Sequence, residues 1–240
     1  MRKKINFWLS VIFILVMLAI YISFVVFGDV FPVAKMQYVG IILCLLFSLV
    51  IFKDRKDTWL VRLALLFTAI SDWFLVIKQN HYFLAMIAFT IVQLMYAVRL
   101  WENDQGIHRN RTHIFFRLIL IMIMELGFII LFSKLHFRFE RLVFIAVIYF
   151  SLLLMNVFLA FIQIRNNILF PIGMTLFFCC DVLVGLANVQ NYITLSESSF
   201  LLDIINFPID LIWVFYFPSQ VLLVLSILSN NSNYKPSNTD

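Results

Sequence analysis

Unbroken apolar runs of about 20 residues recur along the whole chain, and short polar connections separate them. They fall at residues 7–27, 34–52, 59–77, 82–101, 113–132, 142–162, 168–189 and 207–229. A run of this length crosses the hydrocarbon core of a bilayer as an α-helix, whereas a transmembrane β-barrel shows shorter, alternating segments. The chain is therefore predicted to be an all-α integral membrane protein, a single bundle of about eight transmembrane helices.

The composition supports a lipid environment. Hydrophobic residues make up 63% of the 240 residues and charged residues only 13%, where a soluble domain carries about 25% charged residues. Residues 1–240 are expected to form one polytopic membrane domain, with a disordered polar tail over 230–240. The net charge of +5 comes from basic residues between the apolar runs, so it indicates membrane topology and no nucleic-acid partner.

The distribution of basic residues predicts which way the bundle is inserted. When the loops are assigned alternately to two sides, 13 of the 18 Lys and Arg residues fall on the side of the N-terminus. Cytoplasmic loops carry such an excess, so both termini are predicted to be cytoplasmic. The expected location is a membrane, as a multi-pass protein, and the cytoplasmic membrane if the source is bacterial.

The cysteines and histidines show no metal-binding pattern. Cys44, Cys179 and Cys180 lie inside apolar runs without a CxxC pair, and the four histidines show no HExxH spacing. The sequence therefore predicts neither a metal site nor a cofactor.

Three carboxylic residues lie at membrane depth: Asp72, Glu125 and Asp181. Ionisable groups in hydrocarbon are costly and usually face a protein interior or water, so each is a candidate functional residue. Asp72 and Asp181 each lie 13 residues into helices that run in the same direction. Both are then about 20 Å from the cytoplasmic boundary, and this equal depth permits one shared pocket. Glu125 has no comparable partner.

Two glutamines extend this correspondence. The helix after Asp72 carries Gln93 and the helix after Asp181 carries Gln220, at similar distances from their ends. The order suggests an internal repeat of four plus four helices, and such repeats commonly place the binding site at their interface. The simpler alternative is that these polar residues only join helices through hydrogen bonds.

Four segments, in order, resemble the YhhN or lysoplasmalogenase family of membrane hydrolases. They are ALLFTAISDWFLVIKQNHYFLAMIAFTIVQLMYAV, IYFSLLLMNVFLAF, GMTLFFCCDVLVGLANV and VFYFPSQVLLVLS. The family pattern has an Asp in the first and third segments, both kept here, and a closing Tyr-x-x-x-Gln, kept as Tyr216 and Gln220. The departures are Ser71 for Gly, Cys180 for Ser, Gln93 for His, and Met36 for the Pro that follows the lysine of helix 2, Lys35.

The resemblance implies an enzyme that cleaves the vinyl ether bond of a lysoplasmalogen to a fatty aldehyde and a glycerophospho-alcohol. Vinyl ether hydrolysis needs one carboxyl group to protonate carbon and one carboxylate to stabilise the cation and activate water. A buried pair of carboxyl groups ionises one group at a time, which suits these two tasks. Asp72 and Asp181 are the expected catalytic pair, with their individual roles open.

The remaining implied site residues would position the substrate, a lysophospholipid held among membrane lipids. They are Gln93, Tyr96, Gln220, Tyr216 and Lys35. Lys35 could meet the phosphate or simply anchor the helix at the membrane surface. The alternatives are a proton-coupled transporter, which also uses buried carboxylates, and a non-catalytic lipid-binding protein. The oligomeric state is open.

Overall fold

The computed structural model describes residues 2–26, 33–53, 55–103, 111–134, 140–189, 207 and 209–229. All regular structure in these ranges is helical, which confirms the predicted all-α class. The α-helices are α1 (Arg2–Val26), α2 (Val33–Val50), α3 (Lys56–Asp72), α4 (Tyr82–Glu102), α5 (Arg111–Lys134), α6 (Arg141–Ile162), α7 (Leu169–Val189) and α9 (Leu211–Ser229). A π-helix, η1 (Trp73–Lys78), continues α3.

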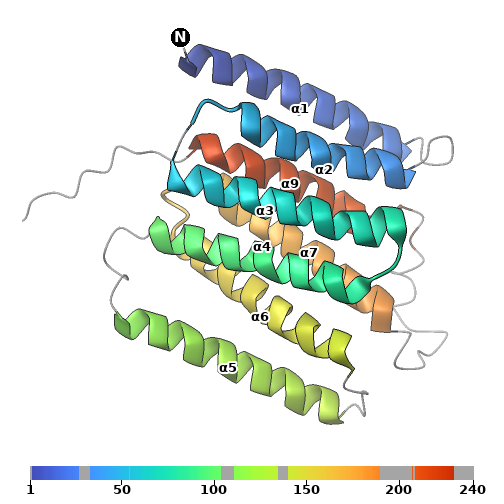
Figure 1. Cartoon of the computed structure of the whole chain (residues 1–240), viewed down its shortest axis with the longest axis vertical. Helices are drawn as coiled ribbons and strands as arrows, with labels where there is room; N and C mark the ends of the chain where they lie inside the picture. Colours follow the sequence, from blue (N-terminus) through green and yellow to red (C-terminus); the bar gives the residue numbers. More distant parts are fainter. Residues whose placement is uncertain are drawn as a thin grey trace, which may run out of the picture.

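Six of these helices form a closed ring. Going around it, α2 packs against α3, α3 against α4, α4 against α6, α6 against α7, α7 against α9, and α9 again against α2. A further contact between α3 and α9 crosses the ring. The two remaining helices lie at opposite edges of the bundle, α1 against α2 and α9, and α5 against α6 (Figure 1). The interior of the ring is therefore the place where side chains from all six helices can meet.

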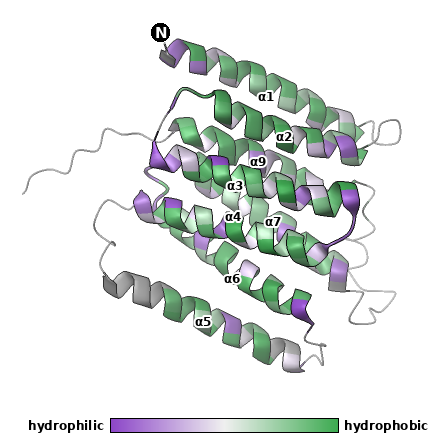
Figure 2. Cartoon of the chain, in the orientation of Figure 1, coloured by the Kyte–Doolittle hydropathy of each residue, from purple (hydrophilic) through white to green (hydrophobic). Residues whose placement is uncertain are grey.

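The outer surface of the bundle is suited to lipid. Seven helical segments of the described chain are long and apolar enough to cross a membrane, with α3 and η1 counting as one. Large apolar side chains such as Trp8, Leu15 and Phe158 are exposed on the outside. Hydrophilic residues gather toward the helix ends, and the helix middles are hydrophobic (Figure 2). Such a surface, exposed over this length, fits hydrocarbon better than water.

The first and last helices have their terminal ends at the same end of the bundle. The Phe52 N–H after α2 donates to Asn6 Oδ1 near the start of α1 (3.3 Å), and Lys53 Nζ donates to the Ile227 carbonyl near the end of α9 (2.5 Å). We call this the Arg99 end, because Arg99 lies there too. Its assignment to the cytoplasm stays a prediction from the basic residues.

Most helix boundaries lie within three residues of the expected ranges, and three differences are larger or change the helix type. Helix α1 begins at Arg2 instead of residue 7, and α9 begins at Leu211 instead of 207. The expected helix over 59–77 is divided into α3 and η1, because its last turns widen to π geometry after Asp72. The loop before α9 and the tail expected over 230–240 lie outside the described residues, except for Phe207, Ile209 and Asp210.

Helix α9 packs closely against α2 through a glycine. A Cβ atom added at Gly40 would lie 2.2 Å from Cε2 of Phe217, so the small residue allows the two helices to approach. Pro218, inside α9, has no N–H for the carbonyl of Val214. The hydroxyl of Tyr21 in α1 donates to that carbonyl instead (3.2 Å), and this bond joins the edge helix to the ring.

Candidate active site

Asp72 lies inside the ring and is held by a tyrosine of another helix. Its carboxyl group is almost completely buried, with 2% of its surface exposed. The hydroxyl of Tyr216 in α9 donates to Asp72 Oδ2 at 2.7 Å. Because α3 and α9 are far apart in the sequence, this bond also fixes how the two helices face each other.

Asp181 is held in the same way from the other half of the chain. The hydroxyl of Tyr149 in α6 donates to Asp181 Oδ2. Asp181 is partly exposed, in contrast to Asp72, and it lies within electrostatic range of Asp72. Helices α3 and α7 do not pack directly on each other, so the two carboxyl groups approach across the interior of the ring. The structure thus brings together the two aspartates that the sequence singled out.

Gln93 and Asn156 form a buried amide pair beside Tyr149. The Asn156 side-chain amide donates to the backbone carbonyl of Gln93 (2.8 Å) and to Gln93 Oε1 (3.0 Å). The Gln93 side chain also lies close to the Tyr149 hydroxyl. Asn156 therefore orients Gln93, and Gln93 lies behind the tyrosine that holds Asp181.

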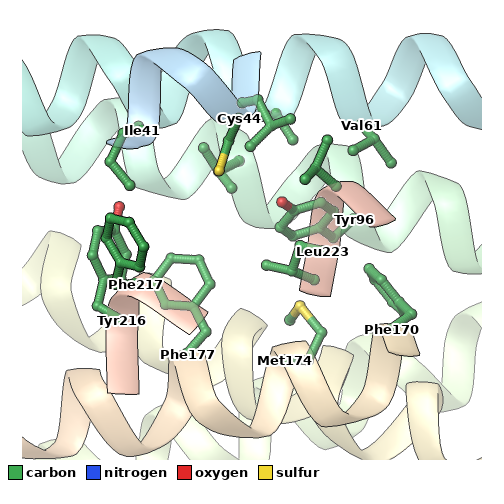
Figure 3. Packing of buried hydrophobic residues seen from close by; sticks show 14 of the residues in the cluster. Ile41, Cys44, Val61, Tyr96, Phe170, Met174, Phe177, Tyr216, Phe217 and Leu223 are labelled. Carbon is green, nitrogen blue, oxygen red and sulfur yellow. The ribbon is translucent and has the colours of Figure 1, made fainter. Parts of the chain in front are cut away.

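Aromatic rings separate the two tyrosines from the rest of the interior. Phe89 lies 5.9 Å from the Tyr149 ring and 6.5 Å from the Tyr216 ring, measured between centroids. Phe177 lies 5.9 Å from Phe89 and 5.5 Å from Tyr216. Figure 3 shows Phe177 beside Tyr216 and Phe217 among the buried side chains. These rings give the carboxyl groups an apolar wall in which charge interactions are strong.

The backbone changes geometry directly after Asp72. The π-helix η1 begins at the next residue and ends at Lys78. Gln79, which follows it, has a left-handed φ of 51°, and His81 has a φ of 54°. π-Helical turns are rare and often found at functional sites, where they redirect side chains. The sequence contained no proline or glycine in this stretch that would have revealed the change.

Each ring helix contributes a polar side chain to this region. In addition to Asp72, Tyr216, Asp181, Tyr149 and Gln93, the hydroxyl of Tyr38 in α2 lies within electrostatic range of Asp72. Tyr38 also packs near Trp73, with centroids 5.7 Å apart. Tyr38 was not among the predicted residues. A single tyrosine near a helix end carries no signal that distinguishes it from an interfacial aromatic residue.

The other predicted residues occupy different environments. Tyr96 and Gln220 are fully buried further along the ring interior, away from the Asp72–Tyr216 pair. Lys35 is exposed near the start of α2, as expected for either of its two proposed roles. Glu125 is partly exposed on α5, outside the ring. The structure therefore separates Glu125 from the aspartate pair.

A second polar cluster at the Arg99 end was not predicted. Arg99 in α4 donates from Nε to Asp57 Oδ1 of α3 (2.5 Å) and from Nη1 to Ser226 Oγ of α9 (2.7 Å). The amide of Asn103 also donates to Asp57 (2.9 Å), and Asn167 of α7 donates to the carbonyl of Ser226 (2.7 Å). Sequence analysis counted Arg99 only among the 13 basic residues on the side of the N-terminus, but just 1% of its surface is exposed. Because Asp57 and Arg99 are near opposite ends of successive helices, a helical hairpin would bring them together, and this was the available signal.

Two charged groups outside the membrane-spanning segments cap α9. Asp210 Oδ1 accepts from the N–H groups of Ile212 (3.1 Å) and Trp213 (3.5 Å), and burial raises the pKa of this carboxyl group despite those bonds. At the other end, Lys53 donates to carbonyls of the last turn. Burial lowers the pKa of Lys53. Within the described ranges, no group of three or more His, Cys, Asp and Glu residues is placed to hold a metal ion.

Comparison with known proteins gives one family match. The model of the YhhN family matches residues 31–227, which include both aspartates and all of the ring helices except the last two residues of α9. No curated protein and no solved structure matches the chain. The match covers most of the 240 residues and agrees with the resemblance of the four sequence segments. The chain, a multi-pass membrane protein by its helices, therefore belongs to the YhhN family.

Proposed function

We propose that the protein is an intramembrane hydrolase that cleaves the vinyl ether bond of a lysoplasmalogen. The observation that carries the proposal is the pair of interior carboxyl groups, Asp72 and Asp181, each held by a tyrosine from a different helix. Membership of the YhhN family supports a lysoplasmalogenase-like hydrolase in general terms. The specific bond, the lipid substrate and the catalytic residues are our inference.

The proposed reaction proceeds through a series of proton transfers. One carboxylic acid donates its proton to the alkene carbon that is not bonded to oxygen, which converts the vinyl ether to an oxocarbenium ion. The other group, as a carboxylate, stabilises this cation and removes a proton from the water that attacks the carbon bonded to oxygen. The hemiacetal then breaks down to a fatty aldehyde and the free glycerol hydroxyl. A proton passing from the second carboxyl group to the first restores the starting state.

The two aspartates have environments that suit such a division of roles. Two carboxyl groups within electrostatic range of each other in an apolar interior do not readily carry two negative charges at once, so we expect one of them to keep its proton. Each tyrosine donates a hydrogen bond, which an ionised carboxylate accepts well. We leave open which aspartate is the acid.

The substrate would enter from the lipid. A lysoplasmalogen has one hydrocarbon chain, which can pass between helices while its head group stays near the membrane surface. Of the two carboxyl groups, Asp181 is the more accessible, because it is partly exposed whereas Asp72 is buried. We therefore expect the hydrocarbon chain of the substrate to approach the two aspartates from the α7 side. Exposed Lys35 would be available to the phosphate in this proposal.

The direct test is aldehyde release from a lysoplasmalogen by the purified protein in detergent. Asp72→Asn and Asp181→Asn should each lower kcat by roughly 100-fold or more, because general acid–base groups contribute about 10²–10⁴-fold. The matched control is Glu125→Gln, which removes a carboxyl group at membrane depth outside the ring and should keep the parental rate.

Two results would contradict the proposal. One is a folded parent protein that releases no aldehyde across head groups and pH values. The other is an Asp72→Asn or Asp181→Asn variant that retains full activity. In the first case, proton-coupled uptake into vesicles would test the transporter alternative.

A further inference from the structure

Seven buried side-chain polar atoms have no hydrogen-bond partner among the described residues, and four of them lie on α3, α4 and α9 between the aspartate pair and the Arg99 cluster. These four are Thr68 Oγ1, Gln93 Nε2, Tyr96 Oη and Gln220 Oε1. All four residues are fully buried, at 0% exposure. A buried polar group without a partner is costly, and in native proteins it usually binds ordered water or an ion. These four therefore need an explanation.

Two of the four groups lie at one level, directly beyond the aspartate site. Thr68 is one helical turn before Asp72 in α3, and Gln220 is one turn after Tyr216 in α9. Residues four apart share a helix face and lie about 6 Å apart along the axis. Because Asp72 and Tyr216 are hydrogen-bonded and the two helices are antiparallel neighbours, Thr68 and Gln220 are both about one turn closer to the Arg99 end.

The other two groups come from α4, which packs on α3. Gln93 and Tyr96 are three residues apart and so share one face of this helix. Asn156 holds the oxygen of the Gln93 amide, which leaves its nitrogen as a free donor. The Tyr96 hydroxyl lies within electrostatic range of Arg99 and of Cys44. Figure 3 shows the Tyr96 ring between Val61 and Leu223, with its hydroxyl directed to the side where Cys44 lies.

The chemistry of the four groups suits water. Gln93 Nε2 only donates, Gln220 Oε1 only accepts, and the hydroxyls of Thr68 and Tyr96 do both. A buried water makes about three hydrogen bonds of mixed kind, so this set can satisfy it. None of the four groups is charged, and the set mixes donors with acceptors, which suits neutral water better than a cation or an anion.

A cavity lined mostly by polar residues lies at the Arg99 end of the bundle. It measures about 20 Å³ and is lined by Arg99, Asn103, Gln163, Asn166, Asn167 and three apolar residues. A polar cavity of about 10–15 Å³ is enough for one water molecule. Tyr96 lies three residues before Arg99 in α4, so it stands between this cavity and the groups beside the aspartates.

We propose that Thr68, Gln93, Tyr96 and Gln220 form an internal water site that supplies the aspartate pair from the Arg99 end. The supply role rests on the proposed hydrolase function, because water is the second substrate of vinyl ether hydrolysis. The lipid would then enter sideways from the membrane, and the water would arrive from the Arg99 end through the interior of the ring. The site itself requires no catalytic activity, so it is tested separately.

The water site is tested by radiolytic footprinting of the whole protein in detergent. Ionising radiation produces hydroxyl radicals from nearby water, and these oxidise adjacent aromatic side chains, which mass spectrometry detects. Tyr96 should be oxidised at a dose that oxidises the exposed Tyr82, although Tyr96 has no exposed surface. The buried, stacked rings of Phe13 and Phe47 serve as dry controls. A Tyr96 as unreactive as these two rings would overturn the proposal.

A second measurement confirms or rejects hydration at Thr68. If its hydroxyl binds water, Thr68→Val should lower the melting temperature, because the water loses a partner. If the hydroxyl is dry and unpaired, the same change should raise it. Thr90→Val is the matched control, since the Thr90 hydroxyl donates to the Met86 carbonyl within its own helix (2.8 Å). A raised melting temperature for Thr68→Val would count against the water site.

The supply role has its own test. Thr68→Val should lower kcat for aldehyde release while KM stays unchanged, because the substrate still binds but water reaches the cation less often. Thr90→Val should change neither constant. An unchanged kcat in Thr68→Val would reject the supply role. If the parent protein releases no aldehyde, footprinting and the melting temperatures still decide whether the site holds water, so the two proposals fail separately.

Discussion

At the scale of single residues, two tyrosines control the aspartate pair. A phenol hydroxyl bonded to a carboxylate oxygen stabilises the ionised form and fixes the direction of the remaining oxygen. Tyr216 and Tyr149 provide this contact to Asp72 and Asp181 from different helices. Gln93, whose amide oxygen accepts a hydrogen bond from Asn156, lies next to Tyr149. The position of each carboxyl group therefore depends on its own tyrosine, which comes from a different helix.

Removal of one phenol hydroxyl tests this dependence. Tyr149→Phe should lower kcat for aldehyde release by roughly 10–100-fold, since a hydrogen bond to a charged group is worth about 1.5–3 kcal/mol. Tyr21→Phe is the control, because its hydroxyl bonds a backbone carbonyl outside the site, and it should keep the parental rate. A parental rate in Tyr149→Phe would exclude Tyr149 from positioning Asp181.

At the scale of elements, α9 determines how closely the neighbouring helices of the ring pack together. It contacts α7, α2, α3 and α1, and it supplies Tyr216 and Gln220 to the interior. Its approach to α2 depends on Gly40, since the Phe217 ring fills the space where a side chain would lie. Phe217 itself is packed against Tyr21 and Phe24 of α1, with centroids 5.8 Å and 5.2 Å away, so it has little room to move.

Gly40→Ala should therefore destabilise the protein. An overpacked core typically costs about 1–3 kcal/mol, and the melting temperature in detergent should fall accordingly. Gly127→Ala in α5 is the control, because nothing lies within 4 Å of the added Cβ, and alanine favours a helix. If Gly40→Ala melts no lower than Gly127→Ala, the close approach of α2 and α9 is wrong.

At the scale of the whole molecule, the Arg99 cluster joins four ring helices. Arg99 and Asn103 of α4 contact Asp57 of α3, while Arg99 and Asn167 of α7 both bond Ser226 of α9. The Arg99 guanidinium also lies 4.4 Å from the centre of the Phe170 ring. Because both charged side chains of the ion pair are almost fully buried, removal of one leaves the other without compensation.

Arg99→Leu should destabilise the protein by roughly 3–5 kcal/mol, the usual cost of breaking a buried ion pair. The double variant Asp57→Leu/Arg99→Met should regain much of this loss, since it leaves no buried charge. Arg141→Met, an exposed change at the start of α6, should stay within about 0.5 kcal/mol of the parent. Unfolding in mixed detergent measures all three. A single variant as stable as the double would show that Arg99 is not paired in the folded protein.

The internal repeat also belongs to this scale, and it stays a prediction. Helices α3 and α4 pair closely in the first half and α7 and α9 in the second, while α4 meets α6 and α9 meets α2 across the halves. These two contacts between the halves are equivalent to each other if the first four helices correspond to the last four, as a repeat of four plus four helices would require. It also places Asp72 and Asp181 on corresponding helices, α3 and α7.

The sequence alone determined the class of fold and the most conspicuous candidate functional residues. Apolar runs reveal transmembrane helices because hydrocarbon requires every backbone group to bond within its own segment. A carboxyl group in such a run is conspicuous for the same reason, and Asp72 and Asp181 could be found without a structure. Gln220 was found from the correspondence between the two Gln-bearing helices, and Tyr216 from the family resemblance.

The partners of these residues were decided by the tertiary structure. Tyrosine and asparagine are common in contacts between membrane helices, so Tyr149 and Asn156 did not stand out in the sequence. Only the packing of α6 against α7 and α4 places Tyr149 beside Asp181 and Asn156 beside Gln93. The sequence did not reveal that Arg99 is buried, because a basic residue near a helix end is usually exposed. Rotation of each helix about its axis determines these contacts. A uniformly apolar helix carries little information about that rotation, because lipid and protein interior accept the same side chains.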